Sequence, residues 1–120
     1  MDTQHRFNKT EETQTFAAGQ AIFREGQPGD VLYIVVEGAV DILINEQMLE
    51  QLGPGDIFGE MALIEDRPRS ATAIARTDCL LTPISRTHFL ALIQRTPLFA
   101  LQVMRVLAHR LRRTNQQRFS

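Results

Sequence analysis

The regular spacing of turn residues up to Ile84 restricts the fold of this chain more than any other feature. Groups that contain glycine, proline or asparagine recur at roughly 8–12-residue intervals and separate short apolar stretches. These groups lie at residues 17–19, 26–30, 37–38, 45–46 and 53–56. Many short strands joined by such turns are typical of a β-sandwich, a β-barrel or a jelly roll.

The apolar stretches between these turns are the expected strands. They lie at residues 22–23, 31–36, 40–44, 48–52, 71–75 and 79–84. Val40, Ile42 and Ile44 alternate around Asp41, which is the two-residue period of a strand that buries one face. Most glycines are expected in turns that need a positive φ, namely those at 26, 29, 38, 53, 55 and 59.

After Ile84 the pattern becomes helical. Ser85 can cap a short helix, and Thr96 with Pro97 is a cap followed by proline at the first helical position. From residue 98 to residue 117 the chain has neither glycine nor proline, which predicts a long helix. The predicted organisation is a polar N-terminal arm (1–13) and a single domain (14–120), with a β-roll over 14–84 and helices over 85–117.

One segment inside the roll does not fit a strand. Residues 59–64 alternate poorly and contain good helix formers, so we expect about one and a half helical turns there. The first backbone amides of such a helix have no partner within it, and they can bind an anion.

Glu60 falls in the first turn of this short helix, and Arg69 follows the loop after it. Arginine can bind phosphate oxygens through two parallel N–H groups, which the ammonium of lysine cannot do. A carboxylate only accepts hydrogen bonds, so Glu60 suits hydroxyl donors such as those of a ribose. The two residues predict a pocket for a small sugar phosphate. The alternative is a solvated ion pair that contributes little to stability.

These motifs resemble those of the cyclic nucleotide-binding domain family, which includes the bacterial catabolite activator protein and the regulatory subunit of protein kinase A. Residues 58–63, five intervening residues and residues 69–73 are similar to the phosphate-binding cassette of the family, without a gap. Residues 22–38 are similar to its second signature, although Phe23 replaces the smaller apolar residue common there. The resemblance covers residues 16–114.

The resemblance implies a mainly β fold: a jelly-roll sandwich or barrel of the double-stranded β-helix type, with a short helix in the cassette and two C-terminal helices. It implies that Glu60 accepts the ribose 2′-OH, that Arg69 clamps the cyclic phosphate, and that Ser70 and Ala71 supply a hydroxyl and backbone amides. Thr114 and Asn115 either reach the adenine or form a solvated helix end. The expected ligand residues are Phe58, Gly59, Glu60, Met61, Ala62, Arg69, Ser70, Ala71 and Thr114.

Composition limits the remaining classes of function. The net charge is −1, which does not favour nucleic acid through bulk electrostatics. Cys79 is the only cysteine, which excludes an intrachain disulfide and fits a reducing cytoplasm. The polar N-terminus does not resemble a signal peptide, and no run reaches the ~20 apolar residues of a membrane span. We therefore expect a cytoplasmic chain that does not bind membranes.

A metal-dependent enzyme built on a jelly roll is the main competing class. Its metal would need clustered histidines, whereas His5, His88 and His109 lie outside the predicted roll. We expect no catalysis, no metal and no cofactor apart from the nucleotide ligand. Direct DNA binding is not expected either, because the chain stops at Ser120, before the helix-turn-helix that many family members carry. The arginines from 105 to 118 form a solvated helix face or a docking surface.

The sequence thus predicts a regulatory sensor that binds a cyclic nucleotide and acts on an unidentified effector protein by moving its C-terminal helix. cAMP is the favoured ligand, and Ser70 leaves cGMP open. The alternatives are the sensor half of a transcription regulator without its DNA-binding part, and a domain of this fold with no nucleotide ligand.

Apolar residues surround most of the helix from 98 to 111, which predicts a homodimer through this helix. Val103 and Val106 are expected near its two-fold axis. The alternative is that the N-terminal arm or the preceding helix covers this surface within one chain.

Overall fold

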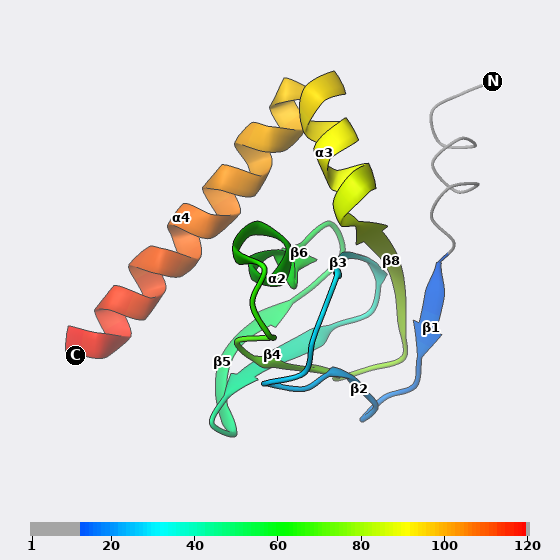
Figure 1. Cartoon of the computed structure of the whole chain (residues 1–120). Helices are drawn as coiled ribbons and strands as arrows, with labels where there is room; N and C mark the ends of the chain where they lie inside the picture. Colours follow the sequence, from blue (N-terminus) through cyan, green and yellow to red (C-terminus); the bar gives the residue numbers. More distant parts are fainter. Residues whose placement is uncertain (1–12, 120) are drawn as a thin grey trace. The chain divides into compact units, whose positions relative to one another are not determined.

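The structure of the chain, a computed structural model, describes residues 13–119, with side chains described up to His109. Within this part of the chain, eight strands form two four-stranded sheets (Figure 1). Their orders are β1-β8-β3-β6 and β2-β7-β4-β5, and the pairings are antiparallel. The strands are β1 (Gln14–Phe16), β2 (Ala21–Phe23), β3 (Val31–Glu37), β4 (Val40–Ile44), β5 (Gln47–Leu52), β6 (Ile57–Phe58), β7 (Thr72–Ala75) and β8 (Cys79–Ser85).

The predicted mainly β jelly roll is confirmed by this topology. The first two strands pair with the last two, β1 with β8 and β2 with β7, so the beginning and the end of the roll lie side by side. The six predicted strands match β2, β3, β4, β5, β7 and β8 to within one residue at each end. Strands β1 and β6 were not predicted, because β6 has only two residues and β1 has only one apolar residue, Phe16.

In the core of the roll, β-branched residues of one strand lie opposite small residues of the neighbouring strand. Val40 pairs with Ala75 and Ile42 with Ala73, and all four side chains are buried. Such pairs let two strands fill the interior without a void, because the small side chain leaves room for the larger one.

Three helices follow the expected positions among the described residues: α2 (Glu60–Glu65), α3 (Arg86–Arg95) and α4 (Pro97–Phe119). Ser85 is the last residue of β8, and α3 begins immediately after it. The carbonyl of Thr96 accepts hydrogen bonds from the amides of Phe99 at 2.9 Å and Ala100 at 3.4 Å, which starts α4 at the predicted proline.

The chain divides into two compact units, the roll up to Arg86 and the helices from Thr87 onward. Inside the second unit, the rings of Phe89 and Phe99 meet edge to face with centroids 6.0 Å apart. Among the described residues, no single helix combines the length and the hydropathy of a membrane span. Only α3 and residues 97–109 of α4, taken as a pair bent by 116°, meet those two criteria. The predicted N-terminal arm lies outside the described residues except for its last residue.

The prediction of a positive φ at the turn glycines is correct for Gly26, Gly38, Gly55 and Gly59. The φ of Gly59, for example, is 81°. It is wrong for Gly29 and Gly53, whose φ is not positive. Gly53 faces open space, whereas Gly29 lies against another side chain, Arg69. Glycine is therefore needed at position 29 because the Arg69 side chain lies close to the backbone there, and not because a turn requires a positive φ.

Four aromatic rings lie together inside the roll. Tyr33 stacks on Phe58 with centroids 5.4 Å apart and on Phe23 at 6.2 Å, while Phe16 meets Tyr33 edge-on at 6.4 Å. Phe23 and Phe58 also contact each other, at 5.9 Å. Because these rings come from β1, β2, β3 and β6, the cluster joins both sheets.

We predict that Tyr33 ionises at a higher pH than an exposed tyrosine. Burial raises the pKa of Tyr33 above 10.0, against the opposing effect of the Arg69 cation, and the Asp30 carboxylate adds to the increase. Since the fold favours the neutral phenol, this contribution to stability is complete below the unfolded pKa and is lost as the pH rises through the folded one.

Tyr33 is the only tyrosine and the chain has no tryptophan, so the phenolate absorbance reports this residue alone. Replacing Arg69 by glutamine is expected to raise the pKa of Tyr33 further, and Asp30→Asn is expected to lower it. A titration midpoint at or below that of free tyrosine, or one that neither variant moves, contradicts the prediction.

Candidate functional site

The site begins where β6 ends and α2 starts. Gly59 lies between these elements in the left-handed region, with φ 81° and ψ 8°, and it is the N-cap of α2. A side chain at this position would be strained, and its Cβ would lie 2.8 Å from Nη1 of Arg69 and 3.3 Å from the ring of Phe23. Glycine here allows Glu60, the first residue of the helix, to turn into the roll, where it is 1% exposed.

Arg69 is held from its backbone as well as from its side chain. Its amide donates to the carbonyl of Gln27 at 2.8 Å, and its carbonyl accepts from the amide of Gly26 at 2.8 Å. These two bonds fasten the segment before β7 to the loop between β2 and β3. The two signatures that lie far apart in the sequence are therefore neighbours in the roll.

The guanidinium of Arg69 is buried, with the residue 6% exposed. Nη1 donates to the carbonyl of Gly59 at 3.0 Å, and Nη2 donates to the carbonyl of Val31 at 2.8 Å. Cζ lies 4.1 Å from the centroid of the Phe23 ring. Nε is also buried, but no acceptor for it is present among the described residues. This orphan donor in the roll can bind an anion.

Electrostatics at the site follow from this burial. Burial lowers the pKa of Arg69, while Tyr33, Asp30 and Glu60 raise it. A guanidinium nevertheless stays protonated at physiological pH, so the cation remains permanent. Since Glu60 and Arg69 are both buried, the alternative of a solvated surface ion pair is wrong.

The other predicted ligand residues differ in exposure. Phe58 and Ala62 are buried at 1% and 3% exposure, and Met61 is 36% exposed. Ser70 is exposed and Ala71 is half-buried, directly after the arginine. Thr114 belongs to α4, but its side chain and that of Asn115 lie outside the described side chains.

Sequence reasoning missed three groups that lie against the guanidinium. They are the ring of Phe23 and the backbones of Gly29 and Val31. Backbone carbonyls carry no sequence signal. In the sequence, only the large apolar residue at position 23 could have indicated this contact. The contact also requires the pairing of β2 with β7, in which Phe23 lies opposite Ala73.

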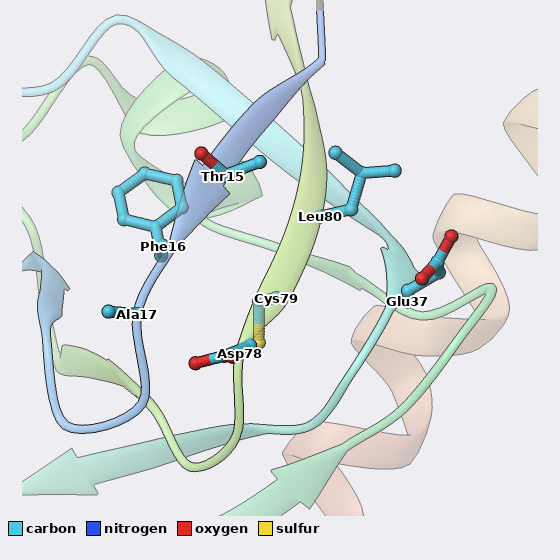
Figure 2. Close-up of a pocket in the computed structure, with 7 residues that line it drawn as sticks. All are labelled: Thr15, Phe16, Ala17, Glu37, Asp78, Cys79 and Leu80. Carbon is cyan, nitrogen blue, oxygen red and sulfur yellow. The ribbon is translucent and has the colours of Figure 1, made fainter.

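A separate hollow of about 480 Å³ lies along β1 and the start of β8 (Figure 2). Its lining residues are Thr15, Phe16, Ala17, Glu37, Asp78, Cys79 and Leu80. The Asp78 carboxylate accepts a hydrogen bond from the amide of Ala18 at 2.9 Å, and the Cys79 thiol donates to the carbonyl of Ala39 at 3.1 Å. The Asp78 carboxylate and the Cys79 thiol therefore already have partners within the fold.

Comparison with known proteins identifies similar sequences and structures. The chain is 41% identical over 102 residues to the cyclic AMP receptor protein of Thermus thermophilus, an alignment that covers 81% of this chain and 47% of that protein. It is 42% identical over 78 residues to the cAMP-dependent protein kinase regulatory subunit of Eremothecium gossypii, which covers 65% of this chain and 17% of the subunit. The crystal structure of the Thermus thermophilus catabolite activator protein is similar with a TM-score of 0.83 and 35% identity, over 95% of this chain and 56% of that one.

The chain thus spans less than half the length of these two curated relatives. The family model of the cyclic nucleotide-binding domain matches residues 13–96, which include both signatures but not residues 97–114 of the expected resemblance. The chain therefore belongs to the cyclic nucleotide-binding domain family.

Proposed function

We propose that the chain is a regulatory sensor that binds a cyclic nucleotide, with cAMP as its ligand. The observation that carries this proposal is the buried Arg69 guanidinium, whose Nε has no acceptor among the described residues, close in the chain to the buried carboxylate of Glu60. A cyclic nucleotide presents an anionic phosphate and a ribose hydroxyl within one small molecule. These are the complements of a cation and an acceptor.

In the proposed complex, Arg69 binds the cyclic phosphate and Glu60 accepts the ribose 2′-OH. Two of the five N–H groups of the guanidinium donate to Gly59 and Val31, which leaves three for phosphate oxygens. The residues beside this pair, Ser70 and Ala71, would add a hydroxyl and a backbone amide. The names of two relatives, a cyclic AMP receptor protein and a cAMP-dependent kinase subunit, favour adenine over guanine as the base.

The signal would pass from α2 and the Arg69 loop to the C-terminal helices, and from there to an effector protein or to a further part of a longer regulator. Such a switch requires two conformations that bind the nucleotide with different affinities. A domain of this fold that binds no nucleotide is the competing proposal, and titration of the purified protein with cAMP and cGMP by calorimetry separates the two.

The first prediction from this proposal is that Arg69→Ala abolishes most of the cAMP binding. Loss of a charge-assisted contact to phosphate is expected to cost about 2–5 kcal/mol, or roughly 30- to several-thousand-fold in affinity. Arg69→Lys is expected to recover little, because its ammonium lacks the planar pair of donors. Arg67→Ala is the matched control, since this exposed arginine belongs to the same loop. Equal affinity of the wild type and Arg69→Ala, measured by calorimetry, rules out the site.

A second prediction concerns Glu60. The wild type is expected to bind 2′-deoxy-cAMP more weakly than cAMP by about 1.5–3 kcal/mol, the scale of one hydrogen bond to a charged group. In Glu60→Gln the gap between the two ligands is expected to shrink, because the amide is a weaker acceptor for the hydroxyl. If the variant discriminates between the ligands as well as the wild type does, Glu60 does not bind the 2′-OH.

We also propose a homodimer through α4, on a different face from the one the sequence indicated. Val103 is 4% exposed in the single chain and Val106 is half-buried, so the expectation that Val103 lies at the two-fold axis is wrong. Among the described side chains of α4, the large apolar ones that are exposed are Leu98, Leu101 and Met104, at 75%, 41% and 60%. Their spacing of three residues places them along one stripe of the helix, which a symmetric partner helix would cover.

The third prediction is that changing both Leu101 and Met104 to glutamate gives a soluble monomer that still binds cAMP. Two charges in an apolar helix interface oppose association, whereas the Arg69 site belongs to the other compact unit. Gln102→Glu, an exposed polar position on the same helix, is the control and is expected to stay dimeric. Light scattering that finds the wild type monomeric at tens of micromolar overturns the dimer.

A further inference from the structure

The guanidinium of Arg69 rests on the aromatic ring of Phe23, a contact that sequence reasoning did not predict. Cζ of Arg69 lies 4.1 Å from the centroid of the Phe23 ring, within the range of a cation–π interaction. Both residues are largely buried, at 6% and 9% exposure. Because water is excluded from this contact, the attraction between the cation and the ring face is stronger than it would be at the surface.

Phe23 is itself fixed in place. Its ring stacks on Tyr33 at 6.2 Å and contacts Phe58 at 5.9 Å. Its backbone belongs to β2 and lies opposite Ala73 of β7, four positions after Arg69. A ring held by two neighbours and by strand pairing can define the position of the more flexible arginine, whereas the reverse is not true.

Other groups around the guanidinium leave room for it or bind its edge. Gly29 contacts it so closely that a Cβ at this position would overlap Nε and Cζ and lie 2.7 Å from Nη2. The carbonyls of Gly59 and Val31 fix Nη1 and Nη2. The ring of Phe23 completes this set by contacting the face of the cation, where hydrogen bonds cannot act.

We propose that Phe23 is a positioning residue that holds the Arg69 guanidinium by a cation–π contact and thereby sets the affinity for the nucleotide. The proposal rests on the proposed function for its effect on binding, while the contact itself can be measured without ligand. Burial lowers the pKa of Arg69 and so disfavours a cation here, and the electron-rich ring face offsets part of this cost. A leucine at position 23 could fill similar space but offers no such face.

The test replaces Phe23 with phenylalanines that carry one, two or three ring fluorines. Fluorine withdraws electron density from the ring face and changes its shape little. Affinity for cAMP is therefore expected to fall stepwise along the series, to about threefold to thirtyfold below the wild type for the trifluoro ring and for Phe23→Leu. The same fluorinated residues at Phe16, whose ring contacts Tyr33, are the matched control and are expected to leave the affinity near that of the wild type. Undiminished affinity of the trifluoro variant at position 23 overturns the proposal.

A double-mutant cycle separates positioning from a general role in packing. In an Arg69→Ala background, Phe23→Leu is expected to have no further effect on the residual cAMP affinity, because the ring no longer has a cation to hold. If Phe23→Leu weakens binding by the same factor in both backgrounds, the ring acts through the fold and the proposal is wrong. Urea unfolding of each variant shows whether the fold is retained.

A ligand-free measurement keeps this proposal distinct from the proposed function. In the proton–nitrogen spectrum, the Nε–H resonance of Arg69, identified by its loss in Arg69→Ala, is expected to be shifted by the ring current and protected from exchange with water. In Phe23→Leu both the shift and the protection are expected to decrease. If neither changes, the contact does not hold the guanidinium. Failure of the wild type to bind cAMP overturns the proposed function alone, and the spectrum still decides the role of Phe23.

Discussion

The burial of one positive charge is the constraint on which the rest of this structure depends. A guanidinium cannot lose its proton to avoid the cost of leaving water, so the fold must provide groups that stabilise it. The carbonyls of Gly59 and Val31 and the ring of Phe23 do so, and they come from three different segments of the roll. Arg69 can be buried only when β2, the start of β3 and the turn before α2 are all in place, so this one charge depends on the closed roll.

The same constraint accounts for the glycines and aromatic rings nearby. Gly29 and Gly59 lie where any side chain would meet the guanidinium, and Phe23 is held by Tyr33 and Phe58. Glu60 is buried in the first turn of α2, where its negative charge favours the cation. A helix of only six residues gains little from its own hydrogen bonds, so packing and the αL turn at Gly59 keep it in position.

The features of the fold and the site that follow from local sequence patterns could be predicted, whereas those that follow from tertiary packing could not. The strands with a two-residue period and the helix that starts at Pro97 were predictable, because local patterns determine them. The short helix and the loop after it already predicted that Glu60 and Arg69 share one pocket, and the resemblance implied a specific role for each residue. Strand β6 has only two residues and β1 only one apolar residue, so neither shows a pattern, and each pairs with a neighbouring strand that lies far away in the sequence. The contact between Phe23 and Arg69, the φ of Gly29 and the burial of Val103 depend on tertiary packing, which no local pattern encodes.

The buried Nε of Arg69, which has no acceptor among the described residues, favours the binding of an anion. A buried donor without an acceptor costs about 1–3 kcal/mol, and an anion that accepts from it recovers that cost as binding energy. The carbonyls of Gly59 and Val31 already orient the rest of the guanidinium, so the proposed phosphate would not have to order a flexible side chain. The buried positive charge favours an anion over a neutral acceptor at this donor, because a hydrogen bond between charged groups is stronger than one to a neutral group. That selectivity for charge is what a sensor of a cyclic phosphate requires, whichever base the ligand carries.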